Sequence, residues 1–161
     1  MIRRLAASVI LVLMSACDSS AAPADARRLA DLLTGDAKGS AAANPVCKLF
    51  SAKEASVYAG RKVQAGSNAA GGRGCQWDTG SDDAGRVMVQ VVRLQDANPP
   101  SGAAGFRGLP ALGKDAYVVD DLCWTVGAPQ GKEFVIVVVD GPNANANTAI
   151  ALMKETLKRR Q

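Results

Sequence analysis

The strongest signal of the fold is the segment Glu133-Phe134-Val135-Ile136-Val137-Val138-Val139. Its unbroken apolar run, most of it β-branched, is typical of a strand that is buried on both faces. A strand with one solvated face would instead alternate between apolar and polar residues. The sequence therefore predicts a sheet in which residues 133–139 form a central strand.

A hairpin is predicted earlier in the chain. Cys75-Gln76-Trp77 opens one strand, and the next is formed by residues 86–94, a run rich in β-forming residues from Val87 to Val92. Residues 78–85 between them consist mostly of Asp, Ser and Gly, which favour turns. Two strands joined by such a turn are expected to pair with each other.

Shorter elements are predicted between this hairpin and the central strand. Residues 116–119 and 122–126 read as two short strands joined by a turn at Asp120-Asp121. Residues 66–74 and 101–113 are rich in glycine, and we expect both to be loops, the first of them flexible.

Two helices flank these strands. Ser51 and Glu54 have the spacing of a capping box, which predicts a helix that ends at Gly60. The last helix is predicted to run to about Arg160, after an asparagine cap. The candidate caps are Asn143, Asn145 and Asn147, and the apolar face consists of Ala149, Ile150, Met153 and Leu157.

The expected fold class is α+β, with an antiparallel sheet of four to six strands and the N- and C-terminal helices packed on one of its faces. Residues 47–161 form the globular domain in this prediction. Residues 17–46 are rich in Ala, Ser, Asp and Gly, a composition typical of a flexible tether. Residues 1–16 form a separate targeting segment.

This targeting segment begins with Arg3 and Arg4, continues with the apolar run from Leu5 to Met14, and ends in Ser15-Ala16 before Cys17. The run is too short to cross a bilayer as a helix. It resembles the bacterial lipoprotein signal peptide, with Leu13-Met14-Ser15-Ala16-Cys17 as the matching residues. The resemblance implies cleavage before Cys17 and a diacylglyceryl thioether on its sulfur. The alternative is an ordinary secretory signal with an incidental cysteine.

Charge and composition limit the classes of partner and cofactor. The net charge of +4 falls to +2 once Arg3 and Arg4 are removed, which is too balanced to predict nucleic-acid binding. The chain has no histidine, which excludes Ser–His–Asp and Cys–His catalysis and histidine-ligated zinc. No cofactor or metal site is predicted. Lys158, Arg159 and Arg160 are expected to complement the dipole of the last helix.

Three short patterns could carry binding chemistry. Residues 71–74, Gly-Gly-Arg-Gly, could hold an anion, but they lack the Lys-Ser/Thr and the helix of a phosphate-binding loop. Residues 78–83 superficially resemble a calcium loop without its downstream Glu, so a solvated turn is favoured. Trp77 and Trp124 could form a ligand platform, although tryptophans on alternating strands more often belong to the core.

The chain also resembles a family of small bacterial lipoproteins of unknown function that is best populated in actinobacteria. The resemblance covers residues 44–160 and rests on three motifs, followed by a strand and a helix that ends in basic residues. It implies an architecture and a location, and it implies no activity. The motifs are Pro45-Val46-Cys47-Lys48-Leu49-Phe50, Cys75-Gln76-Trp77 and Leu109-Pro110-Ala111-Leu112-Gly113-Lys114-Asp115-Ala116-Tyr117.

This resemblance pairs Cys47 with Cys75. A bridge there would also close the glycine-rich loop before Cys75, stabilising the domain by about 3–4 kcal/mol in the chain-entropy treatment. Cys123 is then left over, and its place between Leu122 and Trp124 predicts a small apolar residue that points into the core. A reactive thiol at Cys123 and its pairing with Cys47 or Cys75 are the alternatives.

The function expected from the sequence is that of a membrane-anchored, extracytoplasmic lipoprotein in the cell envelope, on the periplasmic side in a diderm cell. Its domain would be a non-enzymatic module that binds a protein or an envelope component, for example as an inhibitor or immunity factor. The alternative is an envelope hydrolase that uses two carboxylates as acid and base, which would have to lie about 5–9.5 Å apart. The candidate carboxylates are Asp78, Asp82, Asp83, Asp120 and Asp121.

Overall fold

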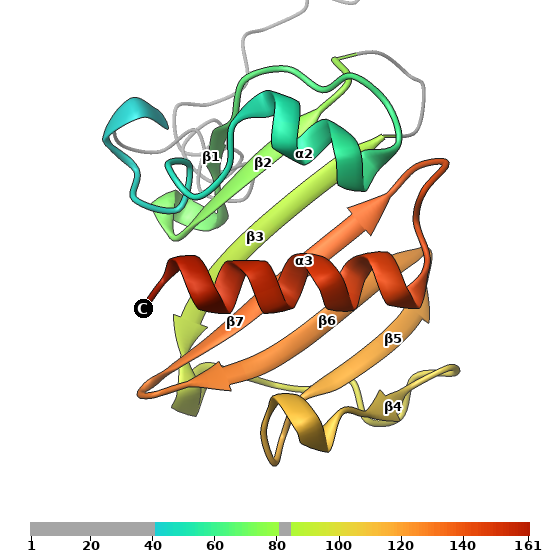
Figure 1. Ribbon diagram of the computed structural model, residues 1–161. Coiled ribbons are helices and arrows are strands. Elements are labelled where there is room, and N and C mark those ends of the chain that lie inside the picture. The colour runs from blue at the N-terminus through green and yellow to red at the C-terminus, as the bar shows by residue number, and fades with distance from the viewer. Residues whose placement is uncertain (1–40, 81–84) are drawn as a thin grey trace, which may run out of the picture.

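The computed structural model describes residues 41–80 and 85–161, which form a sheet with helices in front of it (Figure 1). The predicted signal segment, Cys17, and residues 18–40 of the predicted tether lie outside the described residues, as do Asp82 and Asp83. Within the described part, Asn44 and Val46 are already buried. The packed domain therefore begins before Cys47, where the composition places its start.

The sheet is antiparallel throughout, and its seven strands lie in the order β1-β2-β3-β7-β6-β5-β4. β7 occupies the middle of this order, which confirms the prediction for the apolar run. The predicted hairpin is also present, since β2 pairs with β3. The strands are β1 (Ser67–Ala69), β2 (Gly74–Asp78), β3 (Arg86–Arg93), β4 (Arg107–Gly108), β5 (Tyr117–Asp121), β6 (Cys123–Gln130) and β7 (Glu133–Asp140).

The prediction of four to six strands is wrong because the two outermost strands were expected to be loops. β1 and β4 have three and two residues and lie at opposite edges of the sheet. Such short strands carry no periodic signal in the sequence, and here they follow from pairing with β2 and β5. Residues 66–74 therefore form β1 and a 3-10 turn, Ala70–Gly72, in place of the expected flexible loop.

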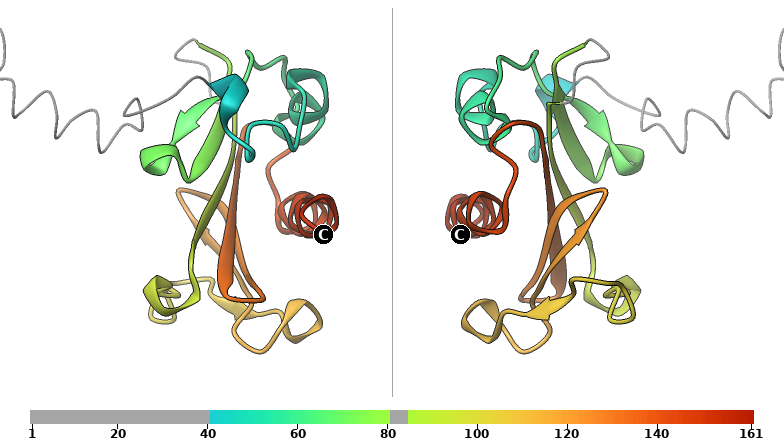
Figure 2. Two further views of the ribbon diagram at one scale, coloured as in Figure 1. Left: turned by 90° about the vertical axis from the view of Figure 1, so that its left-hand side faces the viewer. Right: turned by 90° about the vertical axis from the view of Figure 1, so that its right-hand side faces the viewer.

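The two helices pack on the same face of the sheet, as predicted (Figure 2). α2 (Ala52–Ala59) begins with the expected capping box of Ser51 and Glu54 and ends at Gly60, whose φ is +72°. α3 (Ala146–Arg159) is capped by Asn145, one of the three candidates. α2 contacts β3 and β7, whereas α3 contacts β5, β6 and β7.

The main core lies between these helices and the sheet. Val135, Val137 and Val139 of β7 face the helices and are fully buried. From α3, Leu152 and Met153 fill the same core. The helices are thus held by burial of apolar surface, the main favourable term in folding.

A second, smaller core lies on the opposite face of the sheet. Phe134 of β7 points there, because successive side chains along a strand point to opposite faces. Tyr117 stacks between Phe106 and Phe134, with ring centroids 5.4 and 6.1 Å away. Gly127 lies beneath these rings, where an added Cβ would come within 2.4 Å of Tyr117. The double-sided apolar pattern of β7 is therefore explained by a separate core on each face.

The turn between β5 and β6 differs from the prediction. Asp120 and Asp121 belong to β5, and Asp121 pairs with Cys123, so Leu122 alone makes the turn. Leu122 is fully exposed, and its φ of +59° lies in the left-handed region. The backbone cost of that conformation is about 1–2 kcal/mol for a residue with a Cβ.

Leu122→Gly is therefore expected to raise the free energy of unfolding by about 1 kcal/mol, because glycine adopts this conformation without a clash. Urea denaturation of both proteins measures the difference. Leu122→Ala is the matched control: it retains the strain and removes a side chain that buries nothing, so its stability should equal that of the wild type. Equal stability of the glycine and alanine variants would contradict the strained turn.

Candidate functional site

Cys47 and Cys75 form a disulfide with an S–S distance of 2.03 Å, the pairing that the family resemblance implies. Cys123 is the free cysteine of the described residues. It is half-buried, and its Sγ lies 3.8 Å from Thr125 Oγ1. Its neighbour Trp124 packs against the helix-side core, so Cys123 faces the other side of the sheet. Cys123 is only half-buried and belongs to neither core cluster, so the prediction that it points into the core is wrong.

The carboxylates that the structure describes do not form the pair that a glycan hydrolase requires. Asp78 ends β2, whereas Asp120 and Asp121 end β5, and β3, β7 and β6 lie between these strands. At the usual spacing of strands, this separation is about 19 Å. Asp78 accepts hydrogen bonds from Gln76 Nε2 and from the backbone N–H of Gly80, at 3.0 and 2.9 Å, which is the expected role of a turn residue.

The glycine-rich turn at residues 71–74 is hydrogen-bonded to another part of the chain. Asn44 Nδ2 donates hydrogen bonds to the carbonyl oxygens of Gly72 and Gly74 and to Asn68 Oδ1, at 3.3, 2.8 and 2.9 Å. The turn thus directs carbonyl oxygens to a buried amide, which is the opposite polarity to an anion cradle.

Trp77 and Trp124 belong to the core, as favoured above. Trp77 is 1% exposed and meets the ring of Phe50 edge-on, with centroids 6.0 Å apart. Trp124 is partly buried against the same cluster.

Two cationic side chains at the end of α3 form ion pairs with other parts of the domain. Arg159 bonds to Glu54 and Glu155 at 2.8 and 2.7 Å and lies over the ring of Phe50, 4.4 Å from its centroid. Arg160 pairs with Glu133. These contacts fasten the end of α3 to the segment before α2 and to β7. Of the basic cluster at residues 158–160, two members therefore have structural roles.

The contact with Arg159 lowers the pKa of Glu54 to about 2, and hydrogen bonds from Ser51 add to this effect. A carboxyl whose pKa is lower in the folded state stabilises the protein above its unfolded pKa, and this contribution disappears as the pH falls through the folded value. The stability contributed by Glu54 should therefore be complete near pH 6 and decline from about pH 5 towards pH 2.

We expect the stability difference between the wild type and Glu54→Gln to shrink over that range, as followed by thermal unfolding at several pH values. Arg159→Gln should reduce the same pH dependence, because it removes the main partner of Glu54. A stability difference that does not change with pH would contradict the lowered pKa of Glu54.

Net charge is unevenly divided between the two sides of the domain. We call residues 41–63 and 146–161, which contain α2 and α3, the helix layer. The helix layer contains eight Lys and Arg but only two acidic residues, a net charge of +6. The described residues between its two segments, 64–80 and 85–145, contain six basic and seven acidic residues, a net charge of −1. The helix layer is therefore the candidate binding surface, and its exposed lysines are Lys48, Lys53, Lys62, Lys154 and Lys158.

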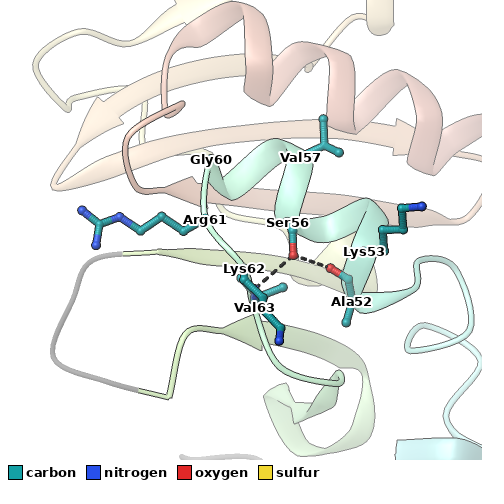
Figure 3. A pocket seen from close by; sticks show the side chains of 8 residues that line it. All are labelled: Ala52, Lys53, Ser56, Val57, Gly60, Arg61, Lys62 and Val63. Carbon is teal, nitrogen blue, oxygen red and sulfur yellow. Dashed lines mark hydrogen bonds between the residues drawn. The ribbon is translucent and has the colours of Figure 1, made fainter.

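A hollow of about 550 Å³ lies in this layer, between α2 and the segment that follows it (Figure 3). Ser56 shapes it by donating to the carbonyl of Ala52 and accepting from the N–H of Val63, at 2.7 and 3.0 Å. Val57 is 68% exposed, and Figure 3 shows its side chain on the side of α2 that faces away from Val63. The rim carries the cations Lys53, Arg61 and Lys62.

The described residues contain no cluster of three or more His, Cys, Asp or Glu side chains placed to hold a metal ion. None of the helices in residues 41–80 and 85–161 is long and apolar enough to cross a membrane.

Comparison of the chain with models of known protein families, with curated proteins and with solved structures finds no match. The resemblance to small bacterial lipoproteins therefore rests on the motifs quoted above, and the candidate site rests on the geometry and charge of the helix layer.

Proposed function

We propose that the chain is a lipoprotein that is anchored at Cys17 on the outer side of the cytoplasmic membrane, or on the periplasmic side of either membrane in a diderm cell. The segment from Leu13 to Cys17 supports the anchor, because small residues precede a cysteine at the end of a short apolar run. The Cys47–Cys75 disulfide supports an oxidising compartment, where such bonds persist.

We infer further that the domain is a non-enzymatic module that binds an anionic protein or envelope component. The observation that carries this proposal is the charge of the helix layer, +6 against −1 for the other described residues. Clustered exposed cations attract anionic partners and speed their association. The exposed Val57 adds an apolar contact at the centre of the α2 surface. A membrane-tethered inhibitor or immunity factor is one form that such a module could take.

The anchor is tested by growing cells that express the full chain with an alkyne-labelled fatty acid and then separating membranes from soluble protein. The wild type should be labelled and should sediment with membranes. Cys17→Ala should be unlabelled, because it lacks the sulfur that carries the lipid. Cys123→Ala is the matched control and should remain labelled, since the proposal gives that thiol no lipid. Labelling that persists in Cys17→Ala would contradict the proposed anchor.

A further inference from the structure

We propose that the anionic partner of the helix layer is the phospholipid surface of the membrane that holds the anchor, so that α2 and α3 face the bilayer. This inference rests on the proposed lipid anchor at Cys17 and adds the orientation of the domain and the class of its partner. Five lysines of the layer, together with Val57, would contact the headgroups.

The first support is that both acidic residues of the helix layer are engaged within it. Glu54 and Glu155 bond to Arg159, at 2.8 and 2.7 Å. Arg160, on the same helix end, pairs with Glu133 of β7. Both acidic side chains of the layer therefore bond to Arg159 near the end of α3, and none of the five exposed lysines is part of these ion pairs.

The second support is the direction in which the helices present these lysines. Lys154 and Lys158 lie one turn apart on α3, on the side opposite to the buried Leu152 and Met153. On α2, Lys53 and Val57 lie one turn apart, opposite to the buried Ala55 and Ala59. Because both helices cover the same face of the sheet (Figure 2), these two outward stripes point away from it together.

The third support is that the other described part of the domain, with a net charge of −1, offers no comparable cationic surface. Its exposed acids, which include Asp96, Asp115, Asp120 and Asp121, are offset by the exposed cations Arg93, Arg107, Lys114 and Lys132. An anionic surface therefore attracts the helix layer more strongly than the rest of the described domain, and this difference favours one orientation.

The fourth support is reach. Residues 18–40 could span at most about 80 Å when fully extended, whereas a domain of this size is roughly 35 Å across. The anchor therefore leaves every face free to turn towards the bilayer, and electrostatics decides which face does so. Cations spread over two helices, with one exposed valine among them, suit a laterally extended surface better than a single pocket on a protein.

The test uses the mature lipidated protein, purified in detergent and reconstituted into vesicles of phosphatidylcholine alone or with 30 mol% phosphatidylglycerol. An amine-reactive ester labels exposed lysines, and mass spectrometry measures the labelling rate at each position. On the anionic vesicles the labelling rate should fall about ten-fold at Lys53, Lys62, Lys154 and Lys158. Each lysine near an anionic surface shifts the equilibrium towards the membrane-facing orientation by about five-fold, and salt in the buffer reduces this effect. High salt should abolish this protection.

Lys114 and Lys132 are the matched internal controls, because both are exposed and lie outside the helix layer. Their labelling rates should be the same on both kinds of vesicle. A triple variant, Lys53→Glu, Lys154→Glu and Lys158→Glu, should lose the protection of Lys62, whereas Lys114→Glu with Lys132→Glu should retain it.

Flotation with neutral vesicles separates the two proposals. A protein that does not float with phosphatidylcholine has no anchor, and the proposed function fails. A protein that floats but keeps its helix-layer lysines equally reactive on both vesicles has an anchor and a different partner, such as an acidic protein, and the orientation proposed here is then wrong.

Discussion

Trp77→Ala is expected to lower the free energy of unfolding by about 3–5 kcal/mol, the usual cost of removing a large aromatic side chain from a core. Trp77 is 1% exposed and is the largest of the fully buried side chains. It contacts Phe50, and an added Cβ at Gly66 would come within 2.8 Å of its Nε1. Because the surroundings are this closely packed, the cavity cannot be filled without moving the β1–β2 edge.

Chemical denaturation followed by far-ultraviolet circular dichroism measures this loss. Trp124→Ala is the matched control, because Trp124 is only partly buried against the same cluster. It should lose clearly less stability than Trp77→Ala. Losses of equal size would show that the complete burial of Trp77 does not set the cost of its removal.

Replacing Cys47 and Cys75 by alanine is expected to cost about 3–4 kcal/mol, because the bridge closes a loop between residues 28 positions apart. The loop contains α2, the turn at Gly60 and β1. In the unfolded chain, the bridge therefore restricts much of the segment that packs against β2 and β3 in the folded domain. The same loss should follow from reduction of the wild type, with thermal unfolding as the measurement.

Cys123→Ala provides the comparison for this prediction. Cys123 is half-buried and belongs to no bridge, so its removal should change stability far less. A double variant at positions 47 and 75 that is as stable as the wild type would show that the bridge does not form in solution.

The parts of the fold that the sequence predicts are those with a strong local signal. The apolar run of β7, the capping box of α2 and the periodic apolar face of α3 each define an element, and all three are present. β1 and β4 were missed because three and two residues are too few to show a periodic pattern, and both strands are defined by their pairing with β2 and β5.

The turn at Leu122 was missed for a related reason. Asp120-Asp121 has the composition of a turn, yet pairing with β6 places both residues in β5. Cys123 was placed in the core from its apolar neighbours, but Trp124 packs against the helix-side core and Leu122 is exposed in the turn, so Cys123 lies on the opposite face from Trp124.

The candidate site was not predicted because the net charge was summed over the whole chain. A net charge of +4 suggests no strong partner, because cations of the helix layer are offset by acids on other elements. Summing charge over each predicted helix would have pointed to α3, with its Lys154 and Lys158. The contribution of residues 48–62 depends on α2 lying on the same face of the sheet as α3, which neither helix shows in its own sequence.

The lipid on Cys17 is the central claim, since both the membrane location and the orientation of the helix layer depend on it. Intact mass spectrometry of the protein extracted from membranes tests it most directly. The account predicts a chain that begins at Cys17 and is heavier than its amino-acid sequence by a diacylglyceryl group, with or without an N-terminal acyl chain. A chain that still begins at Met1, or one whose Cys17 sulfur is unmodified, would contradict it.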